Sequence, residues 1–182
     1  MNIDELVKEA LELGFSHAGK LNMDALVFMP EVRDMCRADR CHSYGKCWTC
    51  PPGCGTLEDI TERAAKYSYG VIVQTTGEME DEFDAETTML AAQNQKDNFI
   101  KLIDIWKKRY DDILPMGAGG CRICEKCTYP DAPCRFPDKA WPSMEAYGLW
   151  VSKVCELSDI PYYYGKNTIT YTSCCLFNNT DQ

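Results

Sequence analysis

Apolar residues recur at helical spacing in four stretches of the chain, residues 3–13, 57–67, 86–110 and 143–157. Because a helix has 3.6 residues per turn, apolar side chains three and four positions apart share one face. The first stretch ends at Gly14, a residue that commonly follows a helix. The third carries an aromatic and aliphatic stripe, which we interpret as core packing: Phe99, Ile103, Trp106, Tyr110 and Ile113.

Capping residues mark the start of two of these helices. Thr56 and Asp59 have the spacing of a capping box, in which each side chain bonds to the other residue's backbone N–H. Ser143 is a suitable N-cap, with Glu145 in the first turn, where the helix dipole favours an acidic residue. We therefore expect one helix from residue 57 and another from Ser143 to Leu157.

Three further stretches read as strands, residues 15–21, 70–76 and 168–172. Between the second strand and the third helix, residues 78–86 are strongly acidic and are expected to form a solvated connection. Helices and strands alternate along the chain, which favours a layered arrangement. The sequence predicts a single α/β domain over residues 1–182, with a three- to four-stranded sheet and cysteine-rich metal-binding loops at one end.

Composition limits the classes of partner. The chain has 182 residues, 45% of them hydrophobic, and a formal net charge of −9. This acidity argues against nucleic-acid binding, and no apolar run approaches the ~20 residues that span a bilayer. The first residues show no signal-peptide pattern, so we expect a cytoplasmic protein whose 12 cysteines are reduced.

The segment 117–137 contains the first candidate metal site. Its cysteines follow the spacing C-x2-C-x2-C, and a fourth comes after six residues; they are Cys121, Cys124, Cys127 and Cys134. This spacing favours a [4Fe-4S] cluster over zinc, since zinc sites usually pair one C-x2-C with a distant second pair. We expect Cys134 to fold back to this cluster, with exchange between two centres as the alternative.

The segment 36–54 contains the second candidate site. Its five cysteines are Cys36, Cys41, Cys47, Cys50 and Cys54. Cys47 and Cys50 form a C-x2-C chelate, yet the other three together with Cys50 make an equally possible set. The spacing does not decide between them, and redox-sensing or buried thiols are the alternative to a metal site. His42 is interpreted as a neighbour of the site rather than a ligand.

Three cysteines fall outside both segments. Cys155 lies on the apolar side of the last predicted helix, and Cys174 and Cys175 follow the last predicted strand. Cys155 is interpreted as a core residue, because free cysteine is among the most buried residue types. For the other two we expect one buried cysteine on one face of the strand with its neighbour pointing away, and the alternative is that both cap a cluster.

The motifs resemble a known family of predicted metal-binding proteins, domain of unknown function 2284. The resemblance spans nearly the whole chain and rests on several motifs, which run from Cys36-x4-Cys41 through Cys50-Pro51-Pro52 and Gly117–Cys127 to Pro133–Pro137 and Ser143–Gly148. It implies an iron–sulfur metal site in anaerobic prokaryotes and no established reaction. It also implies Cys36, Cys41 and Cys50 as ligands, is compatible with Cys54, and makes Cys47 a departure from the pattern.

The leading functional hypothesis is a protein with two [4Fe-4S] clusters that passes single electrons at low potential to a redox partner protein. An iron–sulfur enzyme with an open or substrate-reducing cluster is the second hypothesis, and a structural zinc protein is the third. A P-loop and a dinucleotide-binding glycine motif are absent from the sequence, which argues against nucleotide cofactors. A homodimer is possible on general prevalence.

Overall fold

A four-stranded antiparallel sheet forms the centre of the protein, in a computed structural model that describes residues 2–178. The strands lie in the order β1 (His17–Lys20), β2 (Tyr69–Glu78), β4 (Thr168–Phe177) and β3 (Ile113–Met116). The two long central strands pair along ten residues, from Tyr69 opposite Phe177 to Glu78 opposite Thr168. This confirms the predicted α/β class and sheet size.

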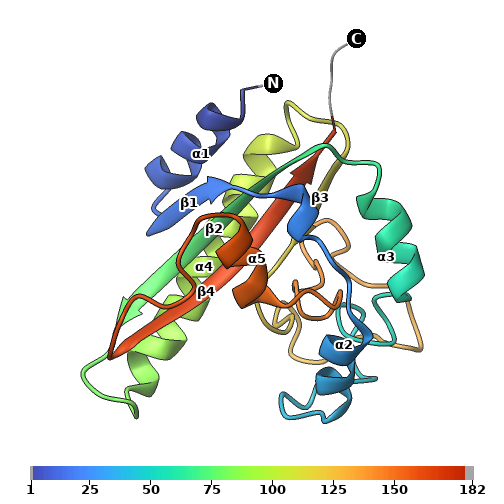
Figure 1. Ribbon diagram of the computed structural model, residues 1–182. Coiled ribbons are helices and arrows are strands. Elements are labelled where there is room, and N and C mark those ends of the chain that lie inside the picture. The colour runs from blue at the N-terminus through green and yellow to red at the C-terminus, as the bar shows by residue number, and fades with distance from the viewer. Residues whose placement is uncertain (1, 179–182) are drawn as a thin grey trace.

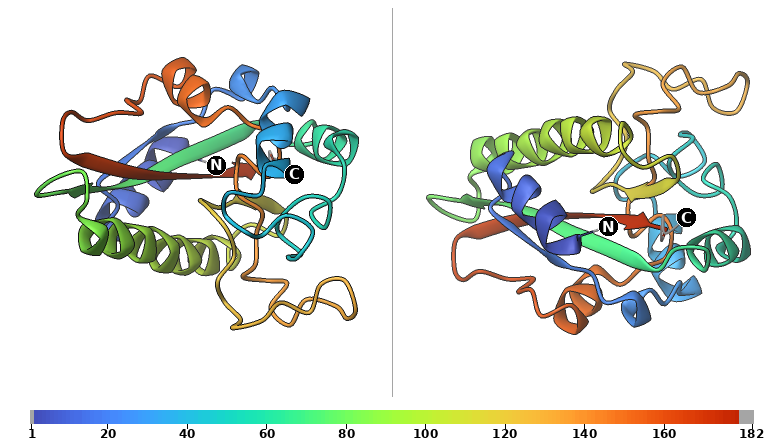
Figure 2. Two further views of the ribbon diagram at one scale, coloured as in Figure 1. Left: turned by 90° about the horizontal axis from the view of Figure 1, so that it is seen from below. Right: turned by 90° about the horizontal axis from the view of Figure 1, so that it is seen from above.

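Helices cover both faces of the sheet (Figures 1 and 2). On one face lie α1 (Ile3–Glu12) and the long α4 (Ala85–Trp106), whose stripe packs on β2 and β4. The other face is covered by the short helix η1 (Met23–Ala25), by α3 (Leu57–Ala64) and by α5 (Val151–Leu157). The remaining helix is α2 (Pro30–Arg37). No helix within residues 2–178 combines the length and the apolar character needed to cross a membrane.

Because the sheet is covered on both sides, successive residues of β4 enter different cores. Cys174 packs in the core beneath α5, and Cys175 packs in the core beneath α4. Both side chains are fully buried, as is Cys155 on α5. All three are therefore core residues, as expected for Cys155. Cys174 and Cys175 do point to opposite faces of the sheet, but both are buried because each face is covered.

The prediction of a helix from Ser143 to Leu157 is wrong over its first half. Residues 144–148 form turns, the Ala146 N–H donates to Ser143 Oγ, and α5 begins only after Trp150. Gly148 has a φ of +93°, which helical residues do not adopt. The Gly148 carbonyl instead accepts a hydrogen bond from the Met29 N–H at 2.8 Å.

The boundaries of other elements also differ from the predictions. Helix α3 ends at Ala64 rather than residue 67, and α4 ends at Trp106 rather than residue 110. Ile113, predicted to continue the stripe of α4, instead opens β3, a strand that was not predicted. Helix α2 was missed as well. The acidic residues 79–84 do form a largely exposed connection between β2 and α4.

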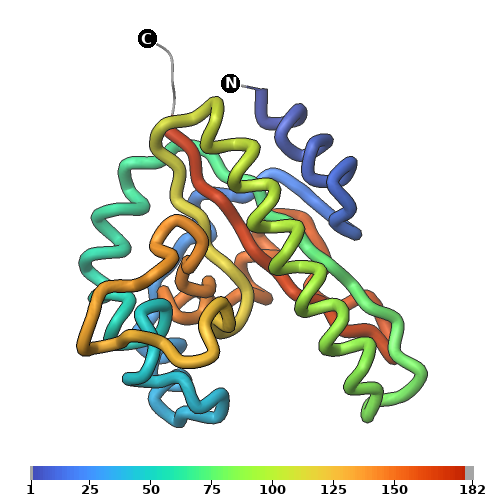
Figure 3. Tube along the Cα trace, turned by 180° about the vertical axis from the view of Figure 1, so that it is seen from behind, coloured from blue at the N-terminus to red at the C-terminus, as the bar shows by residue number. Residues whose placement is uncertain are grey.

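Apart from Cys36, which lies in the last turn of α2, the cysteines of the two cysteine-rich segments lie in long stretches without helices or extended strands. Residues 38–56 connect α2 to α3, and residues 117–150 connect β3 to α5. The views in Figures 1 and 3 place the two stretches side by side beyond the edge strand β3. The fold thus brings together two stretches that are separated in the chain by residues 57–116.

Candidate metal centres

The two cysteine-rich segments contact each other around Trp48. The indole Nε1 donates to the Ala132 carbonyl at 3.0 Å, and the indole meets the Tyr129 ring edge-on, with 4.9 Å between ring centroids. Gly53 allows the Tyr129 ring to pack closely against this loop, because a Cβ at Gly53 would lie 2.7 Å from the Cys47 carbonyl and 2.9 Å from the Tyr129 ring. The contact therefore fixes how the two segments sit against each other.

A first cavity, which we call the five-cysteine cavity, lies at this contact. Four of its thiols come from the predicted C-terminal site and one from the N-terminal segment: Cys121, Cys124, Cys127, Cys134 and Cys47. Trp48, Ile123 and Phe136 contribute apolar walls. The structure thus brings the whole predicted C-terminal set to one cavity and adds Cys47 to it.

The environment of Cys127 favours a thiolate. Burial raises the pKa of Cys127, but hydrogen bonds from the backbone of Tyr129 and of Trp48 and from the Cys47 side chain outweigh burial, so the pKa lies below its ordinary value. Burial also raises the pKa of Cys121, and a backbone hydrogen bond from Ile123 opposes that effect. Metal ligation requires the deprotonated thiol, so these backbone donors suit a metal site.

A second cavity, which we call the three-cysteine cavity, is lined by Cys36, Cys41 and Cys50. Burial raises the pKa of Cys50 to about 12, and the nearby Cys47 thiol acts in the same direction. Burial also raises the pKa of Cys36, and the neighbouring Cys41 thiol raises it further. A metal bound here would have to displace protons from buried thiols.

Cys54 adjoins the three-cysteine cavity and is held by Arg33 of α2. The guanidinium Nη2 donates to Cys54 Sγ at 2.9 Å and to the Gly55 carbonyl at 2.7 Å, while Nε donates to the Ala146 carbonyl at 3.0 Å. Burial raises the pKa of Cys54, and the charge of Arg33 lowers it. Cys54 also lies close enough to Cys36 to raise the pKa of that thiol.

The capping box predicted ahead of α3 is confirmed directly after Cys54. Thr56 Oγ1 accepts from the Asp59 N–H at 3.1 Å, and the Thr56 N–H donates to Asp59 Oδ2 at 2.7 Å. Helix α3 thus begins at a fixed position beside the three-cysteine cavity. His42 is exposed and lines neither cavity.

All 12 cysteines are free thiols. Within residues 2–178, no group of three Cys, His, Asp or Glu side chains converges on a position for one metal ion. Eight of the nine candidate thiols instead line the two cavities, and Cys54 is near enough to Cys36 to affect its pKa. Sulfur donors gathered in this way fit the chemistry of an iron–sulfur centre, whose ligands are cysteine thiolates.

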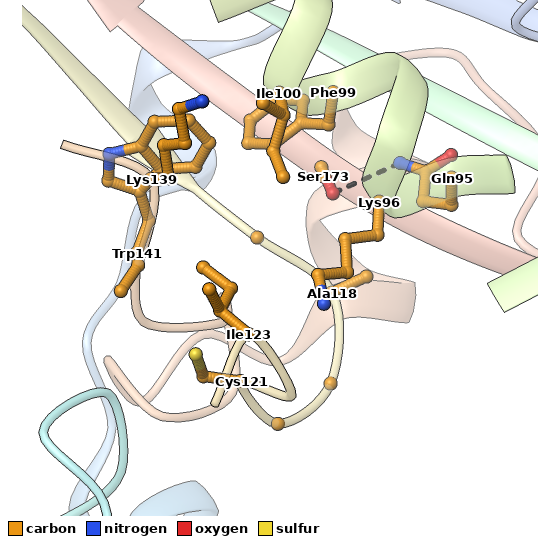
Figure 4. A pocket seen from close by; sticks show the side chains of 14 residues that line it. Gln95, Lys96, Phe99, Ile100, Ala118, Cys121, Ile123, Lys139, Trp141 and Ser173 are labelled. Atoms are coloured by element: carbon orange, nitrogen blue, oxygen red, sulfur yellow. Dashed lines mark hydrogen bonds between the residues drawn. The ribbon is translucent and has the colours of Figure 1, made fainter. Parts of the chain in front are cut away.

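Sequence reasoning missed Arg33, Trp48 and a third cavity that shares Cys121. Residues of α4, the Gly117–Gly120 loop and the segment 139–141 line this lysine cavity (Figure 4). Lys96 and Lys139 both line it, Lys96 beside Ala118 and Lys139 beside Trp141. Gln95 is 1% exposed and donates to Ser173 Oγ at 3.0 Å, while Gln95 Oε1 has no hydrogen-bond partner in the described part of the chain. No local sequence signal marks these residues, because their roles depend on contacts between distant segments.

Comparison with known proteins gives one family. The family model described as predicted metal-binding protein, DUF2284, matches residues 19–177, which include both cysteine-rich segments and nearly all of the sheet. Neither the curated proteins nor the solved structures searched contain a match. The matched region includes all nine candidate thiols, and the resemblance seen in the sequence motifs is confirmed. The chain therefore belongs to the DUF2284 family of predicted metal-binding proteins.

Proposed function

We propose that the protein binds two [4Fe-4S] clusters and transfers single electrons at low potential to a redox partner protein. One cluster would sit at the five-cysteine cavity, and the other would sit at the three-cysteine cavity together with Cys54. The observation that carries the proposal is that eight cysteines line two neighbouring cavities and that Cys54 lies close to one of these thiols, Cys36. A bound cluster would supply the electron-storing chemistry.

The number and spacing of the thiols favour iron–sulfur clusters over zinc. A structural zinc site needs four donors and usually draws them from two separated pairs. Here three cysteines follow one another at intervals of three residues, and a fourth joins them at the same cavity. Backbone N–H groups that donate to cysteine sulfur, as at Cys127, are among the features that tune cluster potentials.

The surrounding residues have separate roles in this proposal. Trp48 and Phe136 would limit access of water to one centre, and Arg33 would place positive charge beside the other. The net charge of −9 and the thiolates disfavour an added electron, which supports a low potential. We further propose a cytoplasmic location, where thiols stay reduced, and a homodimer as a possible state.

Metal analysis tests the proposal directly. Protein purified without oxygen should be brown and contain about eight irons and about eight sulfides per chain, as two cubes require. Reduction by dithionite should produce an electron paramagnetic resonance signal. As a control, Cys155→Ala should retain the iron, because Cys155 lies in the core away from both cavities. A colourless protein that contains zinc and no iron would refute the iron–sulfur proposal.

The lysine cavity favours a second candidate function, reduction of a small anionic substrate. This cavity shares Cys121 with the five-cysteine cavity, so a molecule bound there would lie beside the C-terminal centre. Lys96 and Lys139 would attract a negatively charged group. Small carboxylates should then change the resonance signal of the reduced wild-type protein but not that of a Lys96→Ala/Lys139→Ala variant. Unchanged spectra in both proteins would remove the basis for this function.

A further inference from the structure

Cys47 and Cys50 are the C-x2-C pair that sequence spacing alone would assign to one metal. In the structure the two residues line different cavities: Cys47 belongs to the five-cysteine cavity, and Cys50 belongs to the three-cysteine cavity. A tight turn connects them, in which the Cys50 N–H donates to the Cys47 carbonyl at 3.2 Å. The pair therefore lies on the boundary between the two candidate centres.

The contacts of Cys47 favour the C-terminal centre. Its side chain is hydrogen-bonded to Cys127. Cys47 is also near enough to Cys121 to raise the pKa of that thiol. The residue that follows, Trp48, donates its backbone N–H to Cys127. Cys47 is 8% exposed and its carbonyl packs against Gly53, so the thiol is held in this position.

The contacts of Cys50 favour the N-terminal centre. It lines the three-cysteine cavity with Cys36 and Cys41. Cys47, Cys41 and Cys54 are all near enough to affect the ionisation of Cys50, but Cys47 does not line this cavity. Cys36 in turn is affected by Cys41 and Cys54. These four cysteines form a complete donor set for one cluster without Cys47.

We propose that the C-x2-C pair is divided: Cys47 is a thiolate donor to the C-terminal centre, and Cys50 is a ligand of the N-terminal centre. The inference rests on the proposed function and deepens it. The N-terminal set is then Cys36, Cys41, Cys50 and Cys54. Five thiols surround the C-terminal centre, and because a cube takes one protein ligand on each of its four irons, Cys47 would be one of the four that bind it. The two centres are joined covalently through residues 47–50, which provides a short path for an electron.

Two full-length background proteins test the assignment. Cys36→Ser/Cys41→Ser/Cys54→Ser should retain only the C-terminal centre, and Cys121→Ser/Cys124→Ser/Cys134→Ser should retain only the N-terminal centre. Adding Cys47→Ala to the first background should at least halve its iron content or shift its resonance signal. The same change should leave the second background unaltered. An effect confined to the second background, or no effect in either, would overturn the inference.

Single variants of the otherwise intact chain provide a second measurement if a background protein fails to fold. The spectrum of Cys47→Ala should change in the same way as that of Cys124→Ser and differently from that of Cys41→Ser. Cys47→Ser separates ligation from hydrogen bonding, because its hydroxyl keeps the hydrogen bond but is a poor iron ligand. A wild-type spectrum for Cys47→Ser, or a Cys47→Ala spectrum that matches Cys41→Ser, would contradict the inference. If wild-type protein binds no iron at all, the proposed function fails instead.

Discussion

Arg33 connects three parts of the chain through one guanidinium group, namely Cys54, the Gly55 carbonyl and the Ala146 carbonyl. Arg33→Gln would leave these acceptors with weaker or missing partners. Charge-assisted hydrogen bonds contribute about 1.5–3 kcal/mol each, so we expect the free energy of unfolding to fall by about 1–3 kcal/mol. Urea unfolding of the metal-loaded protein, in which the segments that carry these acceptors are ordered, measures this loss.

Arg37 on the same helix is the matched control for Arg33. Its side chain is 71% exposed and pairs with Asp34 at 3.4 Å on the surface. Because surface ion pairs contribute little, Arg37→Gln should change the free energy of unfolding by less than about 1 kcal/mol. Equal losses in the two variants would show that the buried hydrogen bonds of Arg33 are not what stabilises this region.

In the iron-loaded protein, Arg33→Gln should also lower the reduction potential of the N-terminal centre, because the variant removes a positive charge beside Cys54.

Gly148 is required both by its backbone conformation and by its close contacts. Its φ is +93°, and a Cβ would lie 2.9 Å from the Met29 carbonyl and 2.8 Å from Leu57. We expect Gly148→Ala to reduce the free energy of unfolding by about 3 kcal/mol, as the sum of strain and clash. Gly165→Ala is the control, since Gly165 has a φ of +115° with nothing within 4 Å. Thermal unfolding should show the larger loss for Gly148→Ala, and similar losses would contradict the role of the clash.

At the scale of single residues, the sequence indicates which thiols matter but not how they divide. The C-x2-C-x2-C spacing correctly brings Cys121, Cys124 and Cys127 to one cavity, because neighbours along a short loop stay together. The position of Cys47 depends instead on how one loop packs on another. That packing rests on Trp48 and Gly53, whose partners lie about eighty residues away.

At the scale of elements, prediction succeeds where the helical signal is complete. Helices α1 and α3 combine an apolar stripe with a recognisable end or start, α4 has a long aromatic and aliphatic stripe, and all three are present. Strand β3 was missed because Ile113 continues the spacing of the preceding helix. The helix predicted from Ser143 was misplaced because its cap is a local turn, and Gly148 separates that turn from α5.

Glu9 of α1 ties that helix to the end of α4. Its carboxylate accepts from Trp106 Nε1 at 3.0 Å and from Arg109 Nη1 at 2.8 Å. The hydrogen bond from Arg109 is the main reason that the pKa of Glu9 lies below its ordinary value of 4.5. A lowered pKa stabilises the folded state above about pH 4.5, and the contribution is lost as the pH falls through the folded-state pKa.

We therefore expect Glu9→Gln to lower the free energy of unfolding by about 1 kcal/mol at pH 7 and by much less near pH 3. Urea unfolding at the two pH values measures the difference. Glu12→Gln is the control, because Glu12 makes only an exposed pair with Lys8 at 3.5 Å. An equal loss for Glu9→Gln at both pH values would show that ionisation of this carboxylate does not contribute.

At the scale of the whole molecule, the protein has two regions with different sources of stability. The sheet and its helices bury two extensive apolar clusters. Residues 38–56 and 117–150 instead form long stretches without regular helices or strands. Segments of this kind are usually functional, and metal-binding segments often depend on the metal for their folding. The sequence predicts the α/β core and the family, whereas the contacts within the second region come only from the folded structure.

Removal of metal should therefore loosen one region and leave the other intact. After chelation, limited proteolysis should cut within 38–56 and 117–150 faster than in the loaded protein, while β2 and β4 remain in protected fragments. Mass spectrometry of the fragments locates the cuts. Cys155→Ala, which alters the core without touching either cavity, should not change the cleavage pattern of the loaded protein. Cuts that occur first in α4 or the sheet would contradict this division.

The contact of Trp48 with Ala132 and Tyr129 has a consequence for how metal is acquired. Ordering one cysteine-rich segment around its cluster also orders a surface on which the other segment packs. The second cluster then meets a segment that has already lost much of its conformational entropy. Under the two-cluster proposal, loading is cooperative: a population with limited iron would divide into empty and fully loaded molecules, and half-loaded molecules would be scarce.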